Sequence, residues 1–175
     1  MVYVITGGPG FGKTILIEKL RNLGYQIGEE TARRIIFQQI ECQGDILPWK
    51  NVSKFEKLVT QERIDFLNRV EIQDIAFSDR GLPDQAGFSL FKGKPISMEL
   101  TSAISMNRYA KKVFVTPPWF QIYMNDPIRT ETFEEAEKIH HFIMKAYVDN
   151  GYELIDLPLT TPDKRIDFIL SLIHI

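Results

Sequence analysis

The chain has 175 residues, of which 44% are hydrophobic and 25% are charged, and its net charge is −2. This composition is that of a globular protein and excludes a disordered chain, while the slightly negative charge argues against general binding to nucleic acid or anionic membranes. The single cysteine excludes an intramolecular disulfide and a cysteine-rich zinc site. No apolar run approaches the roughly 18 residues of a membrane-spanning helix. We therefore expect a cytoplasmic protein with one domain over residues 1–175 and no nucleic-acid or membrane partner, and the oligomeric state is left open.

The first predicted elements are a strand, a glycine-rich loop and a helix. The apolar, β-branched run at residues 2–6 is typical of a central parallel strand that is covered on both faces. It leads into the pattern G-x-x-x-x-G-K-T, which begins at Gly7 and ends at Thr14, and a helical pattern follows from about Lys13. Strand, loop and helix in this order are the context in which this pattern binds phosphate.

The residue types of this loop explain its predicted chemistry. Glycines allow the left-handed backbone conformations that turn successive N–H groups toward one anion, and the start of the helix adds positive potential. Lys13 supplies a charge for the β and γ phosphates, and the Thr14 hydroxyl is placed to ligate Mg²⁺. A glycine-rich turn without a ligand is the alternative, but four specified positions in order seldom arise by chance. We therefore expect ATP to bind at Gly8, Pro9, Gly10, Phe11, Gly12, Lys13, Thr14 and Ile15.

A second strand, predicted at residues 25–28, brings charged side chains to the same edge of the sheet. Glu29 and Glu30 follow this strand, and Arg33 lies in the first turn of a helix predicted over residues 31–43. Ligands of open α/β sheets bind at the carboxyl ends of the strands, so these three side chains are candidates for a second substrate site. The alternative is a solvated helix N-terminus, where the helix dipole favours acidic residues.

The next helix is predicted from the spacing Ser53-x-x-Glu56, which is that of a capping box, and it extends to about Val70. Gln61 and Arg63 fall on this helix. We expect them on its solvated face, although a helix that flanks an acceptor cleft could offer either side chain to a substrate.

The second informative motif ends a strand predicted at residues 75–79. In proteins with a phosphate loop, an acidic residue at the end of a later apolar strand is expected to hold Mg²⁺ directly or through water. In this chain that residue is Asp79. Arg80 would project over the same rim, and Asp84 could contact the substrate or orient either of the other two. The alternative is that Asp79 caps the following helix.

A lid is expected between the fourth strand and the next long helix. Helical segments over residues 85–110 and a strand at residues 113–116 lead into residues 117–131, which lack clear periodicity. We expect these residues to close over the phosphates, with Arg129 neutralising the charge that develops during phosphoryl transfer.

The last part of the chain predicts a helix, a strand and a helix. The spacing Thr132-x-x-Glu135 predicts a capped helix that runs to about Asn150. His140 and His141 are adjacent on it and lack the i, i+4 spacing of metal sites, so both are expected at the surface. A fifth strand at residues 152–155 and a final helix that starts at Pro162 follow.

In this order the motifs resemble those of P-loop kinases, and more closely those of predicted ATPases related to nicotinamide-riboside kinase domains. The resemblance implies a three-layer α/β fold with a five-stranded parallel sheet in the order 2-3-1-4-5, ATP and Mg²⁺ at the phosphate loop, and a lid that carries Arg129. By analogy with nucleoside kinases, Glu30 would accept the proton of the substrate hydroxyl, with Asp79 as the alternative. The residues that carry the resemblance are Gly7 to Thr14, Glu30 with Arg33, Asp79-Arg80-Gly81-x-x-Asp84, Ile128-Arg129-x-Glu131-Thr132, Tyr147-x-x-x-Gly151-Tyr152 and the closing helix.

Other classes of P-loop protein lack support in this sequence. Asp79 is followed by arginine and not by the glutamate with which mechanical ATPases activate water, and no N-K-x-D stretch selects guanine. The length also leaves no room for the small helical domain of ring-forming ATPases.

The sequence therefore predicts a Mg²⁺-dependent phosphotransferase that uses ATP and acts on a nucleoside, nucleotide or similar small metabolite. The alternatives are a nucleotide-binding regulatory ATPase or GTPase-type module that signals to a protein partner, and a nucleotide-binding scaffold without activity. Neither the acceptor nor the base of the nucleotide is specified. The expected catalytic residues are Lys13, Glu30, Asp79, Arg80 and Arg129, the expected acceptor-binding residues are Glu30, Arg33, Arg80 and Asp84, and the expected Mg²⁺ ligands are Thr14 and Asp79.

Overall fold

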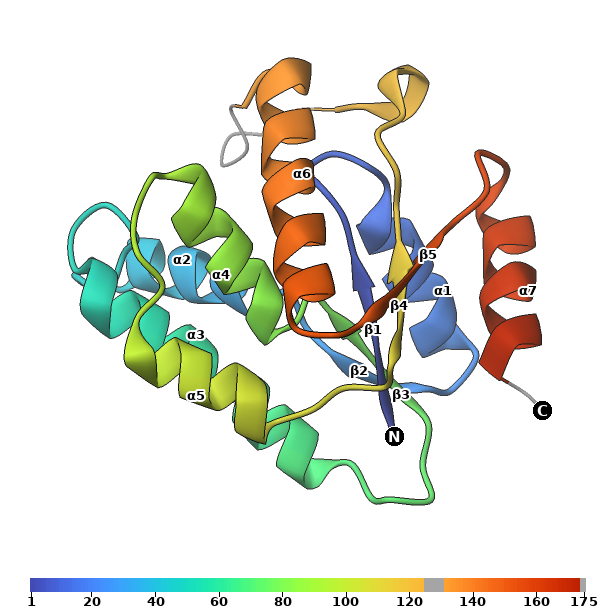
Figure 1. Ribbon diagram of the computed structural model, residues 1–175, viewed down its shortest axis with the longest axis horizontal. Coiled ribbons are helices and arrows are strands. Elements are labelled where there is room, and N and C mark those ends of the chain that lie inside the picture. The colour runs from blue at the N-terminus through green and yellow to red at the C-terminus, as the bar shows by residue number, and fades with distance from the viewer. Residues whose placement is uncertain (125–130, 174–175) are drawn as a thin grey trace.

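Five parallel strands form one sheet in the order β2-β3-β1-β4-β5, with helices on both faces (Figure 1). The computed structural model describes residues 1–124 and 131–173. This sheet confirms the α/β fold that the sequence predicts and the strand order that the resemblance to P-loop kinases implies. The strands are β1 (Val2–Thr6), β2 (Gln26–Gly28), β3 (Ala76–Asp79), β4 (Lys112–Val115) and β5 (Glu153–Asp156).

The helices form the two outer layers. On one face, α1 (Lys13–Asn22) packs beside α7 (Pro162–Ile173). The other face carries α3 (Val52–Arg69), α4 (Leu82–Phe91), α5 (Met98–Met106) and α6 (Phe133–Asp149). The helix α2 (Thr31–Glu41) packs against α3. A short 3₁₀ helix, η1, spans Phe120–Ile122. Within the described part of the chain, none of these helices is both long enough and apolar enough to span a bilayer.

Successive side chains of the central strand β1 pack alternately against the two helical layers. Val4 packs into the cluster formed with α4, α5 and α6, whereas Ile5 packs into the cluster formed with α1 and α7. Both side chains are completely buried. Because a strand between two helical layers has no solvated face, it reads as a continuous apolar run in the sequence.

The carboxyl ends of β1, β3 and β4 meet at one edge of the sheet. The strand register pairs Ile5 with Asp79 and Thr6 with Val115. The glycine-rich loop, Arg80 and Thr116, which follow these strands in the sequence, therefore start from the same edge. This edge is where open α/β sheets bind their ligands.

One of the two predicted capping boxes is wrong and the other is confirmed. The N-cap of α3 is Asn51, whose side chain accepts a hydrogen bond from the Lys54 N–H at 3.3 Å, and Ser53 already lies inside the helix. At the start of α6, the Glu135 N–H donates to Thr132 Oγ1 at 3.2 Å, and the Thr132 N–H donates to Glu135 Oε2 at 2.8 Å.

Candidate active site

The glycine-rich loop, residues 7–14, connects the end of β1 to the first turn of α1. Gly7 has a φ of 144°, and a Cβ atom at this position would lie 2.2 Å from Thr116 Oγ1 and 2.5 Å from the Thr116 carbonyl oxygen. Gly12 is the N-cap of α1 and adopts the left-handed conformation, with a φ of 80°. Since glycine has no side chain to cap the helix, the first N–H groups of α1 remain for another acceptor.

Lys13 lies against the loop from which it projects. Its side chain is buried, and Nζ donates hydrogen bonds to the carbonyl oxygens of Gly8 at 2.6 Å and Gly7 at 3.2 Å. Thr14 and Ile15 follow on the exposed side of α1. The ammonium group is thus held where it can reach an anion bound by the loop.

Asp84 is a buried carboxylate with four hydrogen-bond donors. Oδ1 accepts from Thr6 Oγ1 at 2.6 Å and from Arg80 Nη1 at 2.8 Å, and Oδ2 accepts from the Gly81 N–H at 2.8 Å and from the Tyr147 hydroxyl at 2.6 Å. Burial by itself raises the pKa of this carboxyl, but the charges of Arg80 and Arg63 and the hydrogen bonds outweigh burial, so the pKa is lowered. These contacts place Asp84 beneath the rim, where it positions its neighbours.

Arg80 connects the loop to the end of β2. Its Nη1 also donates to the Gly7 carbonyl oxygen at 3.0 Å, and its Nε lies 3.5 Å from Glu30 Oε1. Burial by itself lowers the pKa of the guanidinium, but the negative charges of Asp84, Glu30 and Asp79 outweigh burial and raise the pKa. The backbone of Arg80 has a φ of 69°, a conformation that non-glycine residues seldom adopt, and such strain is common at functional sites.

A cavity of about 360 Å³ lies beside the loop and contains three of the four predicted acceptor residues. The fourth, Asp84, is completely buried and does not line this cavity. Glu30, Arg33 and Arg80 line it together with Pro9 of the loop. Its walls are largely apolar and come from α2, α3, α4 and the loop between α2 and α3; they include Ile36, Trp49, Phe55, Val59 and Phe88. A larger hollow of about 660 Å³ lies along β2 and α3, and its described lining contains no residue of the glycine-rich loop.

Asp79 is the last residue of β3 and is almost completely buried. Its carboxylate and the Thr14 hydroxyl are hard oxygen donors, which suit Mg²⁺. Among residues 1–124 and 131–173, no cluster of three or more His, Cys, Asp or Glu side chains could hold a metal by itself. This donor set fits a Mg²⁺ ion that takes its remaining ligands from phosphate and water.

The sequence-based expectation for His140 is wrong, because this residue contacts the loop. His140 Nδ1 accepts a hydrogen bond from the Gly8 N–H at 3.2 Å, and its ring meets that of Phe11 edge-on at 5.9 Å. Burial and the positive charges of Lys13, His141 and Arg80 lower the pKa of His140 to about 4. A signal was present in the sequence, since His140 lies one helical turn after the buried Ala136, whereas His141 is exposed as predicted.

Residues 117–124, which form the described part of the expected lid, lie against the loop. A Cβ atom on Gly10 would be 2.7 Å from the Tyr123 ring, and one on Gly12 would be 3.0 Å from Ile122 Cδ1. The Tyr123 ring also packs edge-on against Phe133 at 5.3 Å. Arg129 lies outside the described residues.

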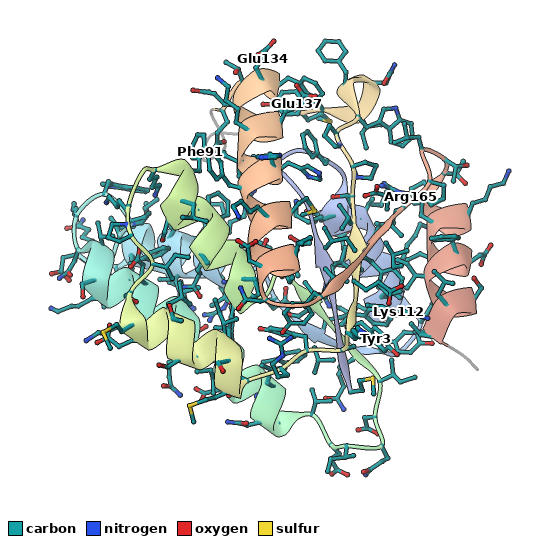
Figure 2. The ribbon with its side chains drawn as sticks, in the orientation of Figure 1. Tyr3, Phe91, Lys112, Glu134, Glu137 and Arg165 are labelled. Carbon is teal, nitrogen blue, oxygen red and sulfur yellow. The ribbon has the colours of Figure 1, made fainter. Side chains whose placement is uncertain are left out.

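Arg165, on the first turn of α7, is a buried arginine that the sequence does not predict. Its side chain points to the inner side of the helix (Figure 2), and the residue is only 2% exposed. The guanidinium carbon lies 5.8 Å from the centre of the Trp119 ring, and burial lowers the pKa of the group. A single arginine in an otherwise solvated first turn carries no spacing signal that could have identified it.

A family model described as "AAA domain" matches residues 2–165 of the chain. The comparison of the chain with curated proteins found no match. Many solved structures match the chain, and three examples at low sequence identity follow. Deoxyadenosine kinase from M. mycoides with bound dATP has a TM-score of 0.65 and 16% identity, and the alignment covers 100% of both chains. Thymidylate kinase from Candida albicans has a TM-score of 0.69 and 12% identity, with 99% of this chain and 90% of that chain covered. NadR protein in complex with NAD and AMP-PNP has a TM-score of 0.69 and 17% identity; the alignment covers 99% of this chain but only 49% of NadR.

Proposed function

Because the chain belongs to the AAA-domain family of P-loop NTPases and has the fold of P-loop kinases, we propose that it is an ATP-dependent phosphotransferase. The proposed acceptor is a small molecule with a hydroxyl or phosphate group, such as a nucleoside, a nucleotide or a similar metabolite. The proposed cofactor is Mg²⁺.

One observation carries this proposal: the cavity of about 360 Å³ is lined by Pro9 of the phosphate loop as well as by Glu30 and Arg80. An enzyme that only hydrolyses ATP needs room for a water molecule, whereas this cavity is large enough for a small metabolite. Its largely apolar walls would exclude water from the transferred group, which favours transfer over hydrolysis.

At the donor end, the loop would bind the phosphates of ATP. The backbone N–H groups from Gly10 to Thr14 would surround the β phosphate, and Lys13 would pair with the β and γ oxygens. Mg²⁺ held by Thr14 and Asp79 would supply charge neutralisation on the phosphate oxygens. Arg129 is proposed to add positive charge during transfer, although it lies outside the described residues.

At the acceptor end, Glu30 is the proposed general base. When a hydroxyl oxygen of the acceptor forms its bond to the γ phosphorus, its proton passes to the Glu30 carboxylate. The bond between the γ phosphorus and the bridging oxygen breaks, and ADP leaves. Arg80 would hold Glu30 in place through the 3.5 Å contact of its Nε, and Asp84 would in turn hold Arg80. Arg33 lines the same cavity and would contact the acceptor.

A thermal-shift screen of metabolites in the presence of Mg²⁺ and a non-hydrolysable ATP analogue tests the proposal, because a ligand that binds only the folded state raises the melting temperature. We expect at least one metabolite to raise the melting temperature beyond the effect of the analogue alone. In the variant Ala32→Trp, whose side chain would fill the cavity, the shift caused by the analogue should remain while that caused by the metabolite disappears. If Ala32→Trp retains the metabolite shift, the acceptor does not bind in this cavity.

A further inference from the structure

Arg165 is a buried cation with unsatisfied hydrogen-bond donors. Its exposure is 2%, and its Nε and Nη2 atoms have no hydrogen-bond partner in the described structure. No carboxylate from residues 1–124 or 131–173 forms an ion pair with it. By contrast, the equally buried Arg80 is paired with Asp84 and Glu30.

A buried arginine with unsatisfied donors destabilises the folded protein when no ligand is bound. A buried guanidinium loses its hydration, and the loss is offset when an anion and hydrogen-bond acceptors replace the water. The two unsatisfied atoms, Nε and Nη2, are also the pair of donors on one side of the guanidinium that can bind two oxygens of a single phosphate or carboxylate group. Since the described residues provide no partner for these two atoms, the ligand that suits them is an anion with two oxygens.

The location of the guanidinium indicates which anion this is. A Cβ atom on Gly12 would lie 3.5 Å from Arg165 Nη1, so the side chain reaches the phosphate loop at the start of α1. The centre of the Trp119 ring lies 5.8 Å from the guanidinium carbon. The guanidinium therefore lies near both the phosphate loop and the segment that follows β4.

We propose that Arg165 binds the phosphate chain of the donor nucleotide through its Nε and Nη2 atoms, as a second cation beside Lys13. This inference rests on the proposed nucleotide binding at the same loop. The proposed contact is with phosphate oxygens and not with the base, because no carboxylate within residues 1–124 and 131–173 balances the charge of Arg165 and a base carries no negative charge. The ligand class is a nucleoside diphosphate or triphosphate, and inorganic tripolyphosphate shares the chemistry that Arg165 recognises.

Calorimetric titration of ADP and of tripolyphosphate, each with the wild-type protein and with Arg165→Met, tests this proposal. Loss of a charged hydrogen-bond pair should weaken both ligands by about 10- to 100-fold. Lys164→Met is the matched control, because it removes one charge from the same turn at an exposed position and should leave both affinities unchanged. If only ADP is weakened, Arg165 recognises the base or ribose, and if neither is weakened, it has no part in binding; both results overturn the proposal.

Melting temperatures distinguish binding from a merely structural role. Arg165→Met removes a buried charge that has no ion-pair partner in the part of the chain that the structure describes. It should therefore melt no lower than the wild-type protein without ligand, while the increase caused by ADP should be smaller. If Arg165→Met does not fold, Arg165→Lys keeps the proposal testable, since lysine retains the charge but not the two-donor edge. Arg165→Lys should also weaken tripolyphosphate, and wild-type affinity in this variant would contradict the proposed contact.

The outcome also separates this inference from the proposed function. If the wild-type protein binds neither ADP nor tripolyphosphate, the nucleotide-binding premise fails and the inference fails with it. If the wild-type protein binds both and Arg165→Met binds them equally well, only the inference fails. Transfer to an acceptor is not needed for either measurement.

Discussion

Arg80 Nη1 donates a hydrogen bond of 2.8 Å to Asp84 Oδ1, and both side chains are almost completely buried. The same Arg80 nitrogen reaches the Gly7 carbonyl oxygen, while the other carboxylate oxygen of Asp84 accepts from Tyr147 on α6. This ion pair therefore links the start of the phosphate loop, the end of β3 and a helix of the outer layer. The proposed base, Glu30, is the next contact of Arg80.

Asp84→Asn should strongly destabilise the protein. The substitution keeps the shape of the side chain but leaves Arg80 with a weakened set of buried partners, and breaking a buried ion pair typically costs about 3–5 kcal/mol. Urea denaturation measures the change in the free energy of unfolding. The control is Asp163→Asn, which breaks the exposed contact between Asp163 and Lys19 and should cost no more than about 1 kcal/mol. Similar losses in the two variants would contradict a special role for the buried pair.

His140 should make the folded protein less stable in acid. Its pKa is lowered from 6.5 to about 4 in the folded state, so in this interval the unfolded chain binds the proton more readily. Stability from this group is therefore fully present above pH 6.5 and falls as the pH drops toward 4, by at most about 3 kcal/mol in total.

The variant His140→Asn tests this dependence, because the amide oxygen of asparagine can accept the Gly8 N–H but does not titrate. The difference in unfolding free energy between pH 7 and pH 4.5 should be smaller in His140→Asn than in the wild-type protein. His141→Asn serves as the control at an exposed neighbouring position. The prediction is contradicted if the two variants show the same pH dependence.

Lys13→Ala should weaken the binding of ATP. The substitution removes the cation that the loop holds against the carbonyl oxygens of Gly7 and Gly8, and hydrogen bonds to charged groups correspond to about a 10- to 100-fold change in affinity. Lys19→Ala changes a partly exposed lysine on the same helix and should bind ATP as the wild-type protein does. Calorimetric titration with Mg²⁺ and ATP provides the comparison, and unchanged affinity in Lys13→Ala would count against a phosphate site at this loop.

Glu30→Gln should lower the turnover number while leaving ATP affinity intact. General base catalysis typically contributes about 100- to 10,000-fold, and the amide cannot accept the acceptor proton. Glu29→Gln is the matched control, since Glu29 is exposed and pairs with Arg21 away from the cavity. If the two variants turn over equally fast once an acceptor is known, Glu30 is not the base, and Asp79→Asn becomes the next variant to measure.

The parallel strands and the glycine-rich loop could be predicted from local patterns in the sequence, whereas the strand order was implied by the resemblance to P-loop kinases. The strands β1, β3 and β4 are recognisable as short apolar runs. The loop from Gly7 to Thr14 is recognisable by the fixed spacing of its glycines, lysine and threonine. Since the strands are parallel, residues that follow them, such as Glu30 and Arg80, were expected at one edge of the sheet, and the structure places both at the same cavity.

The remaining features depend on how distant elements pack, which no local spacing encodes. The contact of His140 with Gly8 requires α6 to lie against the loop, and the position of Arg165 requires α7 to pack beside α1. The predicted start of α3 differs from the observed one by two residues. Asn51 and Ser53 are both good N-cap residues, and the sequence does not decide which of them begins the helix.

The most direct test of the account is to identify the product to which the γ phosphoryl group of ATP is transferred. Phosphorus NMR of the wild-type protein with Mg²⁺, ATP and the metabolite found in the thermal-shift screen should show one phosphorylated acceptor for each ADP formed. Glu30→Gln should abolish this product, and Glu29→Gln should not. If ADP appears only with an equal amount of inorganic phosphate, at a rate that no metabolite in the panel changes, the cavity beside the phosphate loop is not an acceptor site.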